Sequence, residues 1–520
     1  MNQRDERRDE PRGERRGEPR NELQHRGSPF EMSAPSFREA GHALIDAVAD
    51  FLESIAQRPV SPAETPSELR RLLPADALPE AGAPVTELLA ETSRLLFDHS
   101  LHNGHPRFFG YITSSAAPSG ALADLLAAAV NPNVGGWQLS PIATEIEGQC
   151  VRWIADLLGF PRGGGLLVSG GNMANFVGFL AARRAAGGDQ VRRRGVAAGP
   201  RLVAYGSRET HTWFEKAADL FGLGTENLRW IPVDDRQRIR VDALRAAVAA
   251  DRAAGLRPFL LVGTAGTVST GAVDPLVELA TLACEEELWF HVDGAYGGFA
   301  ALADGAPADL REGLGRADSL AVDPHKWLYA PLEAGCVLVR DRLALRDTFS
   351  YLPPYYRFTG EDEPRENYYE LGPQNSRGFR ALKVWLAIRQ AGRAGYARSI
   401  SQDVALARAL HRAAQARPEL EARTCNLSIA TFRYLPPGVA ADDPAARPAL
   451  NELNEELLAT LRESGEVFLS NAMVADDFLL RACVVNFRTT LADVEAVPDI
   501  VCRHGRALAA RRGVLPATEA

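Results

Sequence analysis

The sequence predicts an α/β fold: a mostly parallel central sheet, preceded by a helical arm and followed by a smaller α+β domain. Between about 145 and 340, short apolar runs alternate with longer helix-prone stretches, which is typical of parallel strands joined by crossover helices. Each run holds four or five mostly apolar residues, as expected for strands that are buried on both faces. The runs cover 201–205, 259–263, 288–292, 319–322 and 336–340.

Four parts follow one another along the chain. Residues 1–35 are almost all charged or polar, so we expect a disordered tail. From Phe37 apolar residues recur at helical spacing, and several prolines then interrupt the pattern, which indicates helices joined by an irregular arm. We expect this helical segment, over 36–115, to serve dimerisation. A large domain over 116–397 contains the sheet and ends in a long helix around 378–390. A small domain over 398–515 includes a strand at 479–487.

The composition argues against several classes of protein. Lys and Arg number 58 against 67 Asp and Glu, a net charge of −9, so a basic footprint for nucleic acid is missing. No apolar run is long enough to span a membrane. The six cysteines lie far apart without a CxxC pair, which indicates neither a disulfide framework nor a metal site. Because the N-terminus lacks an apolar signal stretch, we expect a cytoplasmic protein.

Polar residues directly after the apolar runs are the candidates for chemistry, because ligands bind outside the carboxyl ends of strands in open α/β sheets. The turn Ser169-Gly-Gly-Asn172 leads from an apolar run into residues at helical spacing. Free backbone N–H groups and the helix dipole at such a point attract phosphate. A tight connection between strand and helix is the alternative explanation of these glycines.

Two charged residues follow later runs. Asp293 ends the run at 288–292, and a buried carboxylate needs a cationic partner such as a protonated heterocycle nitrogen. An ion pair with an arginine or a helix cap is the alternative. Lys326, in Asp323-Pro-His-Lys-Trp327, follows the run at 319–322 and is suited to Schiff-base chemistry. For a lone lysine the alternative is a solvated side chain.

His211 follows the run at 201–205, where a neutral imidazole can lie flat on an aromatic cofactor ring; the alternative is a packing histidine. Asp293 and Lys326 are 33 residues apart, the length of one strand-crossover-strand unit, so both belong at one edge of the sheet. A phosphate cradle, an acid for a ring nitrogen, a stacking histidine and a Schiff-base lysine together indicate pyridoxal 5′-phosphate.

Six motifs carry a resemblance to a known family. They are Asn131-Pro-Asn-Val-Gly-Gly-Trp137, Ser140-Pro-Ile-Ala-Thr-Glu145, Ser169-Gly-Gly-Asn-Met-Ala-Asn175, His291-Val-Asp-Gly-Ala-Tyr296, Asp323-Pro-His-Lys-Trp327 and Val484-Val-Asn-Phe-Arg-Thr489. With them the sequence, from about 37 to 515, resembles the group II pyridoxal-phosphate-dependent amino-acid decarboxylases. That family includes aromatic-L-amino-acid, glutamate and histidine decarboxylases and has the type I, aspartate-aminotransferase-like fold.

The resemblance implies a role for each matching residue. Lys326 forms the Schiff base with the cofactor, Asp293 pairs with its pyridine nitrogen, and His211 stacks on its ring. The residues implied to hold the phosphate and the ring substituents are Gly171, Asn172, Ser319 or Thr267, and His325, with Ala295 packing below the ring.

The match also places Tyr351 on the family's mobile catalytic loop. A tyrosine there is the proton donor of family members, whereas a phenylalanine goes with oxidative aldehyde synthases, so Tyr351 implies plain decarboxylation. Tyr355, Tyr368 and His211 are the alternative donors.

For the substrate pocket we expect Phe109 and Trp137. Aromatic-specific relatives place an aromatic residue shortly before this tryptophan, where the present chain has Gly135-Gly136, so the pocket is wider or is filled from elsewhere.

The expected reaction turns an aromatic L-amino acid into the amine and CO₂. Glutamate or 2,4-diaminobutyrate is the alternative substrate, and a non-catalytic regulatory paralogue that binds pyridoxal phosphate is the alternative class. The family implies a homodimer, and the apolar faces of helices around 37–55 and 85–99 suit contact with a partner subunit.

Overall fold

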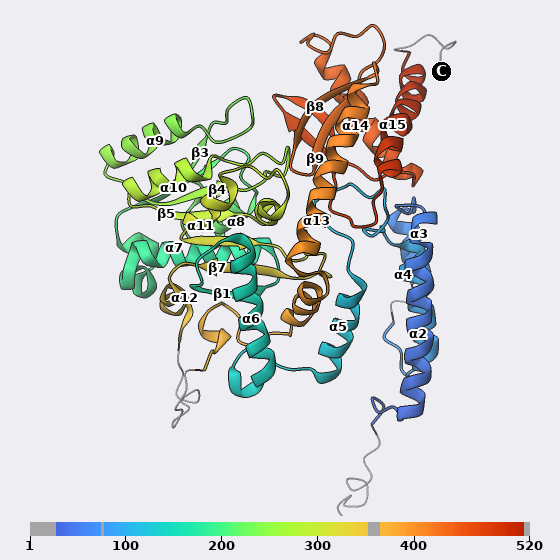
Figure 1. Ribbon diagram of the computed structural model, residues 1–520, viewed down its shortest axis with the longest axis horizontal. Helices are drawn as coiled ribbons and strands as arrows, with labels where there is room; N and C mark the ends of the chain where they lie inside the picture. The colour runs from blue at the N-terminus through green and yellow to red at the C-terminus, as the bar shows by residue number, and fades with distance from the viewer. Residues whose placement is uncertain (1–27, 74–76, 352–364, 514–520) are drawn as a thin grey trace, which may run out of the picture. The chain divides into compact units, whose positions relative to one another are not determined.

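The computed structural model describes residues 28–73, 77–351 and 365–513, so most of the predicted tail lies outside the described residues (Figure 1). The chain divides into two units. One contains Met1–Ser54 and Glu64–Ser100, and the other contains Ile55–Ala63 and Leu101–Ala520. The limits predicted for the four parts of the chain stay a prediction.

The first unit is helical and contains α2 (Ala34–Ser54), α3 (Pro66–Leu72) and α4 (Val85–His99). The rings of Phe51 and Phe97 stack with centroids 4.4 Å apart and join α2 to α4. The Thr65 hydroxyl caps α3 together with Glu68, in the reciprocal arrangement that satisfies two free N–H groups. The helices predicted around 37–55 and 85–99 are confirmed.

The second unit is built on a seven-stranded sheet with the order β1-β7-β6-β5-β4-β2-β3. Strand β7 runs antiparallel to β1 and β6, and the other pairs are parallel. The strands are β1 (Gly164–Val168), β2 (Leu202–Ser207), β3 (Leu228–Ile231), β4 (Arg257–Thr264), β5 (Trp289–Asp293), β6 (Ser319–Val322) and β7 (Gly335–Val339). The mostly parallel sheet and its five predicted strands are confirmed. Strand β3, where the polar Arg229 interrupts the apolar pattern, was not predicted.

Helices connect these strands and cover both faces of the sheet. The α-helices are α5 (Pro118–Val130), α6 (Pro141–Leu158), α7 (Gly171–Arg194), α8 (Trp213–Leu220), α9 (Val241–Ala253), α10 (Leu276–Glu285), α11 (Leu310–Arg316) and α12 (Arg342–Phe349). Short 3-10 helices are η1 (Ile55–Gln57), η2 (Trp137–Leu139), η3 (Val196–Ala198), η4 (Thr225–Asn227), η5 (Gly297–Leu302) and η7 (Tyr368–Glu370).

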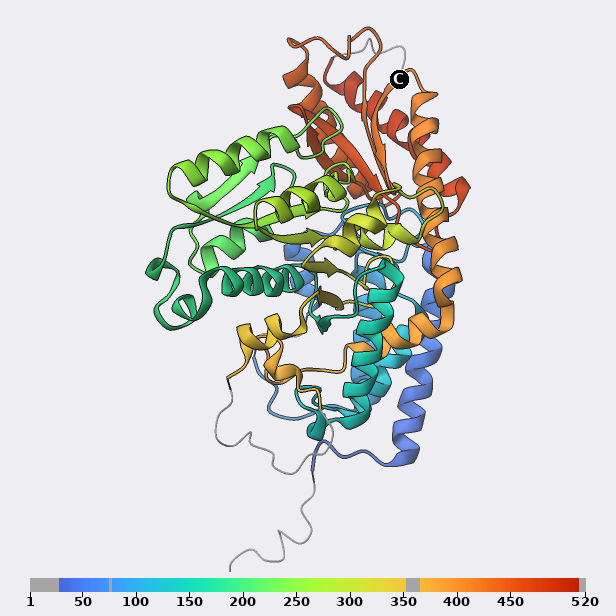
Figure 2. The ribbon, with the colours of Figure 1, turned by 60° about the vertical axis from the view of Figure 1, so that its left-hand side comes forward.

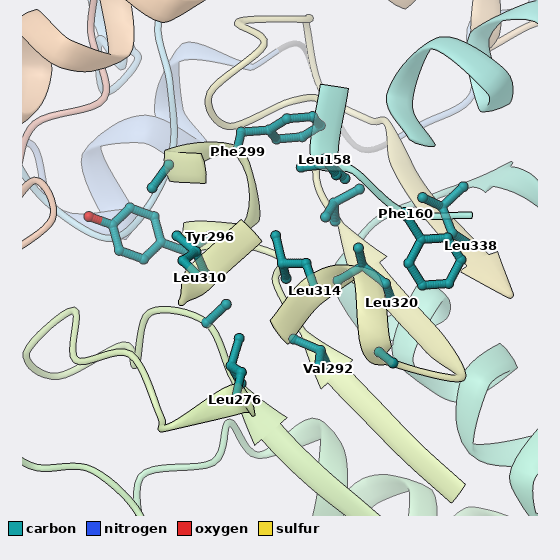
Figure 3. Close-up of a cluster of buried hydrophobic side chains, with 14 of the residues drawn as sticks. Leu158, Phe160, Leu276, Val292, Tyr296, Phe299, Leu310, Leu314, Leu320 and Leu338 are labelled. Atoms are coloured by element: carbon teal, nitrogen blue, oxygen red, sulfur yellow. The ribbon is translucent and has the colours of Figure 1, made fainter. Parts of the chain in front are cut away.

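The largest core lies between the sheet and its helices. Figure 3 shows Val292 of β5 and Leu320 of β6 pointing toward Leu314 of α11, with Phe299 of η5 and Leu158 of α6 close by. All five side chains are fully buried. Such burial contributes about 1.5–3 kcal/mol per large apolar side chain, so this layer holds the strand ends rigidly.

The C-terminal domain contains an antiparallel sheet with the order β10-β11-β9-β8. The long helix α13 (Ala381–Gln415) bends at Gly392 and runs from the large domain into this domain (Figure 2). The other elements are β8 (Leu420–Asn426), β9 (Ile429–Tyr434), α14 (Arg447–Ser464), β10 (Ser470–Val474), β11 (Asp477–Cys483) and α15 (Leu491–Arg511). In the described part of the chain, none of the helices has the length and apolar character needed to cross a membrane.

Two predicted boundaries are wrong. The strand expected at 479–487 ends at Cys483, because the chain beyond it bonds to the segment before Phe109: the Asn486 side-chain amide donates to the His105 carbonyl at 2.8 Å. The helix expected at 378–390 begins at Ala381 and continues to Gln415, because the chain resumes a helical path after Gly392.

Candidate active site

A cavity of about 310 Å³ lies at the carboxyl ends of the parallel strands. Gly171, His211, Asp293 and Lys326 all line it, each from a segment that ends or follows a different strand. The four candidates named from the sequence are thus brought together by the parallel pairing of the sheet. A larger cavity of about 610 Å³, between the segment around Asp304 and strand β8, has none of these residues in its lining.

Asp293 is the last residue of β5 and is 6% exposed. Its Oδ2 accepts a hydrogen bond from Trp213 Nε1 at 2.8 Å, and its Oδ1 accepts one from the main-chain N–H of Ala295 at 3.1 Å. Both donors are neutral, and among the described residues no lysine or arginine forms an ion pair with Asp293. The carboxylate therefore still lacks a cationic partner, which a protonated ring nitrogen would supply.

Lys326 follows β6 and extends into the cavity, where its Nζ lies 3.1 Å from Asp323 Oδ2. The same oxygen lies 3.6 Å from Nε2 of His325. Asp323 is 2% exposed, and its other oxygen, Oδ1, has no hydrogen-bond partner among the described residues. An orphaned carboxylate oxygen beside an amine indicates a site whose polar groups serve a bound ligand.

The imidazole of His211 lines the cavity beside Asp293 and Lys326. Its Nδ1 accepts a hydrogen bond from the Trp213 main-chain N–H at 3.2 Å, so any proton of the neutral ring sits on Nε2. Loss of hydration lowers the pKa of His211; Asp293 opposes this shift and Lys326 adds to it. The ring is consequently neutral near pH 7, as stacking on an aromatic cofactor requires.

The N-terminus of α7 forms one wall of the cavity. No side chain of the described residues caps this helix, so the N–H groups of its first turn remain available as donors. A Cβ atom at Gly171 would lie 2.8 Å from Asp323 Oδ2 and 3.0 Å from Ala295 Cβ. Only glycine therefore allows the backbone to approach this closely. A helix N-terminus without a side-chain cap is a suitable site for phosphate.

Comparisons with known proteins agree with this geometry. The family model described as "Pyridoxal-dependent decarboxylase conserved domain" matches residues 66–434. The chain belongs to the pyridoxal-dependent decarboxylases. It is 34% identical to the aromatic-L-amino-acid decarboxylase of Bacillus atrophaeus over 89% of this chain and 94% of the relative. It is 33% identical to tyrosine decarboxylase 2 of Arabidopsis thaliana over 91% of this chain and 87% of the relative.

Solved structures support the same assignment. The Oryza sativa enzyme TDC, crystallised with PLP and tryptamine, matches with a TM-score of 0.84 and 29% identity over 93% of this chain and 99% of that chain. Tryptophan decarboxylase of Catharanthus roseus, in complex with L-tryptophan, matches with a TM-score of 0.82 and 29% identity over 93% and 100%. The type I fold is thereby confirmed. The decarboxylase is a carboxy-lyase that acts on an amino acid with pyridoxal phosphate as its cofactor.

The contacts described above suit the binding of that cofactor in the cavity of the decarboxylase. The free N–H groups of α7 suit its phosphate, and the unpaired Asp293 carboxylate suits its ring nitrogen. Lys326 Nζ is the primary amine within the cavity. Ala295 and His325 also line the cavity, and Asn172 lies at its exposed rim.

Two predicted phosphate ligands lie outside the lining of the cavity. Thr267 is 1% exposed, and its hydroxyl is bonded to Thr270 and to the Ala272 main-chain N–H. Ser319 is buried at the start of β6, where its Oγ accepts from Trp289 Nε1 at 2.8 Å and lies 2.7 Å from His291 Nδ1. Their hydroxyls are engaged within the protein, and their phosphate roles stay predictions.

Sequence reasoning missed three residues of this site. Thr264, at the end of β4 and paired in register with Asp293, lines the cavity, and its buried Oγ1 has no partner among the described residues. Trp213 binds Asp293, and Asp323 holds Lys326. The sequence contained signals for two of them: Thr264 lies at the end of a strand, and Asp323 lies inside the lysine motif.

Phe109, Trp137 and Tyr351 do not line the cavity of their own chain. Phe109 is fully buried in the core of the C-terminal domain. The Trp137 indole donates to Glu145 at 2.9 Å. Tyr351 is 70% exposed, with the Arg192 guanidinium 3.9 Å from its ring centre. Of the alternative donors, Tyr368 is buried away from the cavity and Tyr355 lies outside the described residues. The roles of all these residues stay predictions.

Proposed function

We propose that the decarboxylase converts an aromatic L-amino acid into the corresponding amine and CO₂. The observation that carries this substrate class is the similarity to aromatic-L-amino-acid decarboxylase and tyrosine decarboxylase at 33–34% identity, with tryptophan decarboxylase 2 of Oryza sativa subsp. japonica at 30%. Each alignment spans at least 87% of this chain and at least 87% of the relative.

The charges around the cavity also favour a neutral substrate side chain. Lys326 is the one lysine or arginine among the described lining residues, and it is needed for the cofactor, so the carboxylate of glutamate would find no cation. Glu209 also lines the cavity, and burial raises its pKa, which weakens its attraction for the ammonium group of 2,4-diaminobutyrate. Ile112 and Val268 supply apolar surface for an aromatic ring.

The residues of the cavity divide the work of the reaction. When bound, pyridoxal phosphate supplies the electron sink that accepts the electron pair of the bond to the departing carboxylate. Asp293 would keep the ring nitrogen protonated, and the positive charge of that nitrogen would stabilise the electron pair that is released when the bond breaks, which lowers the barrier. Neutral His211 would cover the ring without placing a second positive charge beside it. Lys326 Nζ is the amine that would hold the cofactor and would take its place again when the product amine is released.

We propose Tyr351 as the donor that returns a proton to Cα. The tyrosine is exposed at the end of α12, and among the described residues its hydroxyl forms no hydrogen bond that would have to break. Its position outside the cavity of its own chain means that it reaches a reacting Cα either after a movement of its segment or in the cavity of a second subunit. A tyrosine donor supports amine as the product.

We propose further that the enzyme works as a homodimer in the cytoplasm. The apolar residues Leu122, Leu125, Leu126 and Val130 of α5 are each at least half exposed. A contiguous apolar helix face of this kind supports an interface between subunits. The cytoplasmic location rests on the sequence expectation alone.

Release of CO₂ is the direct test of the substrate class. Purified enzyme would be assayed with L-tryptophan, L-tyrosine, L-phenylalanine, L-dopa, L-glutamate and L-2,4-diaminobutyrate, with Lys326→Ala as the inactive control. We expect the highest kcat/KM with an aromatic substrate, at least about tenfold above glutamate, since one lost ion pair is worth about 1–3 kcal/mol. A higher kcat/KM with glutamate or 2,4-diaminobutyrate would refute the substrate class.

A further inference from the structure

The three residues that follow Lys326 are held by helix α13. Tyr396 donates a hydrogen bond to the Leu328 carbonyl at 3.0 Å. Oδ2 of Asp403 accepts two hydrogen bonds, from Trp327 Nε1 at 3.1 Å and from the Tyr329 hydroxyl at 2.8 Å. Every residue of the segment 327–329 is therefore bonded to α13, directly beside the lysine that carries the reactive amine.

Burying the carboxylate of Asp403 at this position is energetically unfavourable. It is 2% exposed, and the donors that face it are all neutral: the Trp327 indole, the Tyr329 hydroxyl and the main-chain N–H of Asn486. Burial raises the pKa of Asp403 to about 7. An apolar side chain of the same size would avoid the desolvation of a carboxylate, so packing alone does not explain an aspartate here.

The backbone conformation beside the lysine also needs to be stabilised by contacts from other parts of the chain. Tyr329 has a φ of 52°, in the left-handed region that residues with a Cβ rarely adopt. Such a conformation persists only where surrounding contacts over-determine it. The bond from the Tyr329 hydroxyl to Asp403 and the bond from the Ala117 main-chain N–H to the Tyr329 carbonyl, at 2.8 Å, supply this constraint.

Asp403 joins two parts of the enzyme. It lies beyond the Gly392 bend of α13, in the half that packs on β8 and β9 of the C-terminal domain. Its third donor, Asn486, follows β11 of the same domain. A single carboxylate group thus connects the C-terminal domain to the segment that carries Lys326.

We propose that Asp403 is a positioning residue for Lys326. By holding Trp327 and Tyr329 it fixes the backbone from which Nζ approaches the aldehyde of pyridoxal phosphate, and it transmits the position of the C-terminal domain to this amine. In the attachment step the lysine nitrogen bonds to the aldehyde carbon and one molecule of water leaves. The inference rests on the assignment of Lys326 as the attachment point, and not on the identity of the substrate.

The test measures attachment of the cofactor to the apoenzyme. Asp403→Leu, Asp403→Asn and Tyr329→Phe would be compared with the wild type and with Gln402→Ala, an exposed neighbour on α13 as control. Pyridoxal phosphate is added, the visible absorbance is followed, and borohydride fixes the product for peptide mapping. The thermal midpoint of each apoenzyme reports separately on folding.

We expect Asp403→Leu to slow attachment on the order of tenfold while the apoenzyme melts within a few degrees of the wild type, because an apolar group replaces a buried carboxylate. Tyr329→Phe should slow attachment in the same direction and add little in the Asp403→Leu background, since Asp403→Leu already removes the bond between Tyr329 and Asp403. Gln402→Ala should attach at the wild-type rate.

Attachment to Lys326 at the wild-type rate in both Asp403→Leu and Tyr329→Phe would overturn the positioning role. If Asp403→Leu does not fold, the attachment rates of Asp403→Asn and Tyr329→Phe provide the test. Wild-type rates in both would overturn the positioning role. Label recovered at another lysine would instead overturn the assignment of Lys326, and that failure is distinguished by the peptide map.

Discussion

At the residue scale, we propose that the site depends on the negative charge of Asp293. Asp293→Asn keeps an oxygen for the Trp213 indole but removes the negative charge that would hold a proton on the ring nitrogen. We expect kcat to fall on the order of 100-fold or more, which corresponds to about 3 kcal/mol of lost stabilisation. Steady-state kinetics on enzyme with measured cofactor content tests this.

The matched control is Asp318→Asn, because that carboxylate accepts the Phe290 main-chain N–H near the opposite end of β5. It should leave kcat within a few-fold of the wild type. A near-normal kcat in Asp293→Asn with full cofactor would show that the ring nitrogen has no need of this charge.

His291, two residues before Asp293, ties stability to pH. Its Nδ1 lies 2.7 Å from Ser319 Oγ and its Nε2 lies 2.7 Å from Asn175 Oδ1, and burial lowers its pKa to about 4. An unfolded histidine has a pKa near 6.5, so below that pH the unfolded chain binds the extra proton first. The contribution of neutral, buried His291 to the free energy of unfolding is therefore complete above pH 6.5. As the pH falls toward 4, this contribution is lost, and the free energy of unfolding decreases by up to about 3 kcal/mol.

Denaturant unfolding of the apoenzyme at pH 7.5 and pH 5 measures this loss. Asp403 changes the stability with the opposite sign, because its pKa is raised to about 7 and the folded chain binds its proton first as the pH falls. The effect of His291 is therefore measured by comparing the wild type with a His291 variant. His291→Gln should show less loss of stability between the two pH values than the wild type. Gln402→Ala, which changes an exposed and uncharged side chain, should retain the wild-type pH dependence. If His291→Gln loses as much stability between pH 7.5 and pH 5 as the wild type, the prediction is wrong.

At the scale of elements, we expect Tyr351, two residues after the end of α12, to determine the product. Tyr351→Phe removes the proposed proton donor but leaves the cavity residues unchanged, so CO₂ can still leave while O₂ competes for the unprotonated carbon. We expect aldehyde, ammonia and peroxide to replace most of the amine. A peroxide assay with amine analysis checks it.

Tyr355→Phe is the comparison, because Tyr355 is the nearest alternative donor in the sequence. If that variant loses the amine while Tyr351→Phe retains it, the proton comes from Tyr355. If neither changes the product, His211 becomes the candidate.

At the scale of the whole molecule, we expect a homodimer formed partly through α5. Light scattering should give twice the chain mass of 56.3 kDa. Leu126→Asp, which places a charge on the exposed apolar face of α5, should shift the enzyme toward monomer and lower its activity on dilution. Leu343→Asp on α12, a leucine of similar exposure, is the control. A fully active monomeric wild type would refute the dimer.

Mixed dimers show where Tyr351 acts. Alone, Lys326→Ala subunits are expected to form no amine, and Tyr351→Phe subunits only a small part of the wild-type amount. If Tyr351 serves the cavity of the partner subunit, a mixture restores one complete site in each heterodimer, up to about a quarter of the wild-type sites for random pairing. If Tyr351 serves its own chain, the mixture forms no more amine than the Tyr351→Phe subunits form alone.

The sequence by itself determined most strands of the central sheet and the residues of the candidate site that follow them. Apolar runs of four or five residues are sufficient for strands β2 and β4 to β7, because burial on both faces selects such runs regardless of their neighbours. The polar residues after these runs then had to meet at one edge, because parallel strands share their carboxyl ends. Gly171, His211, Asp293 and Lys326 could therefore be named before any contact was known.

Only the tertiary structure decided which hydroxyl, amine and acid groups face the cavity. Thr264 lines it while Thr267, three residues later, bonds to its own turn, and Ser319 is enclosed by Trp289 and His291. Trp213 reaches Asp293 across 80 positions, and Asp403 reaches Tyr329 across 74. Such pairs depend on sheet register and on the bend of α13, which are properties of the packed chain, whereas local spacing reports only the residues within one element.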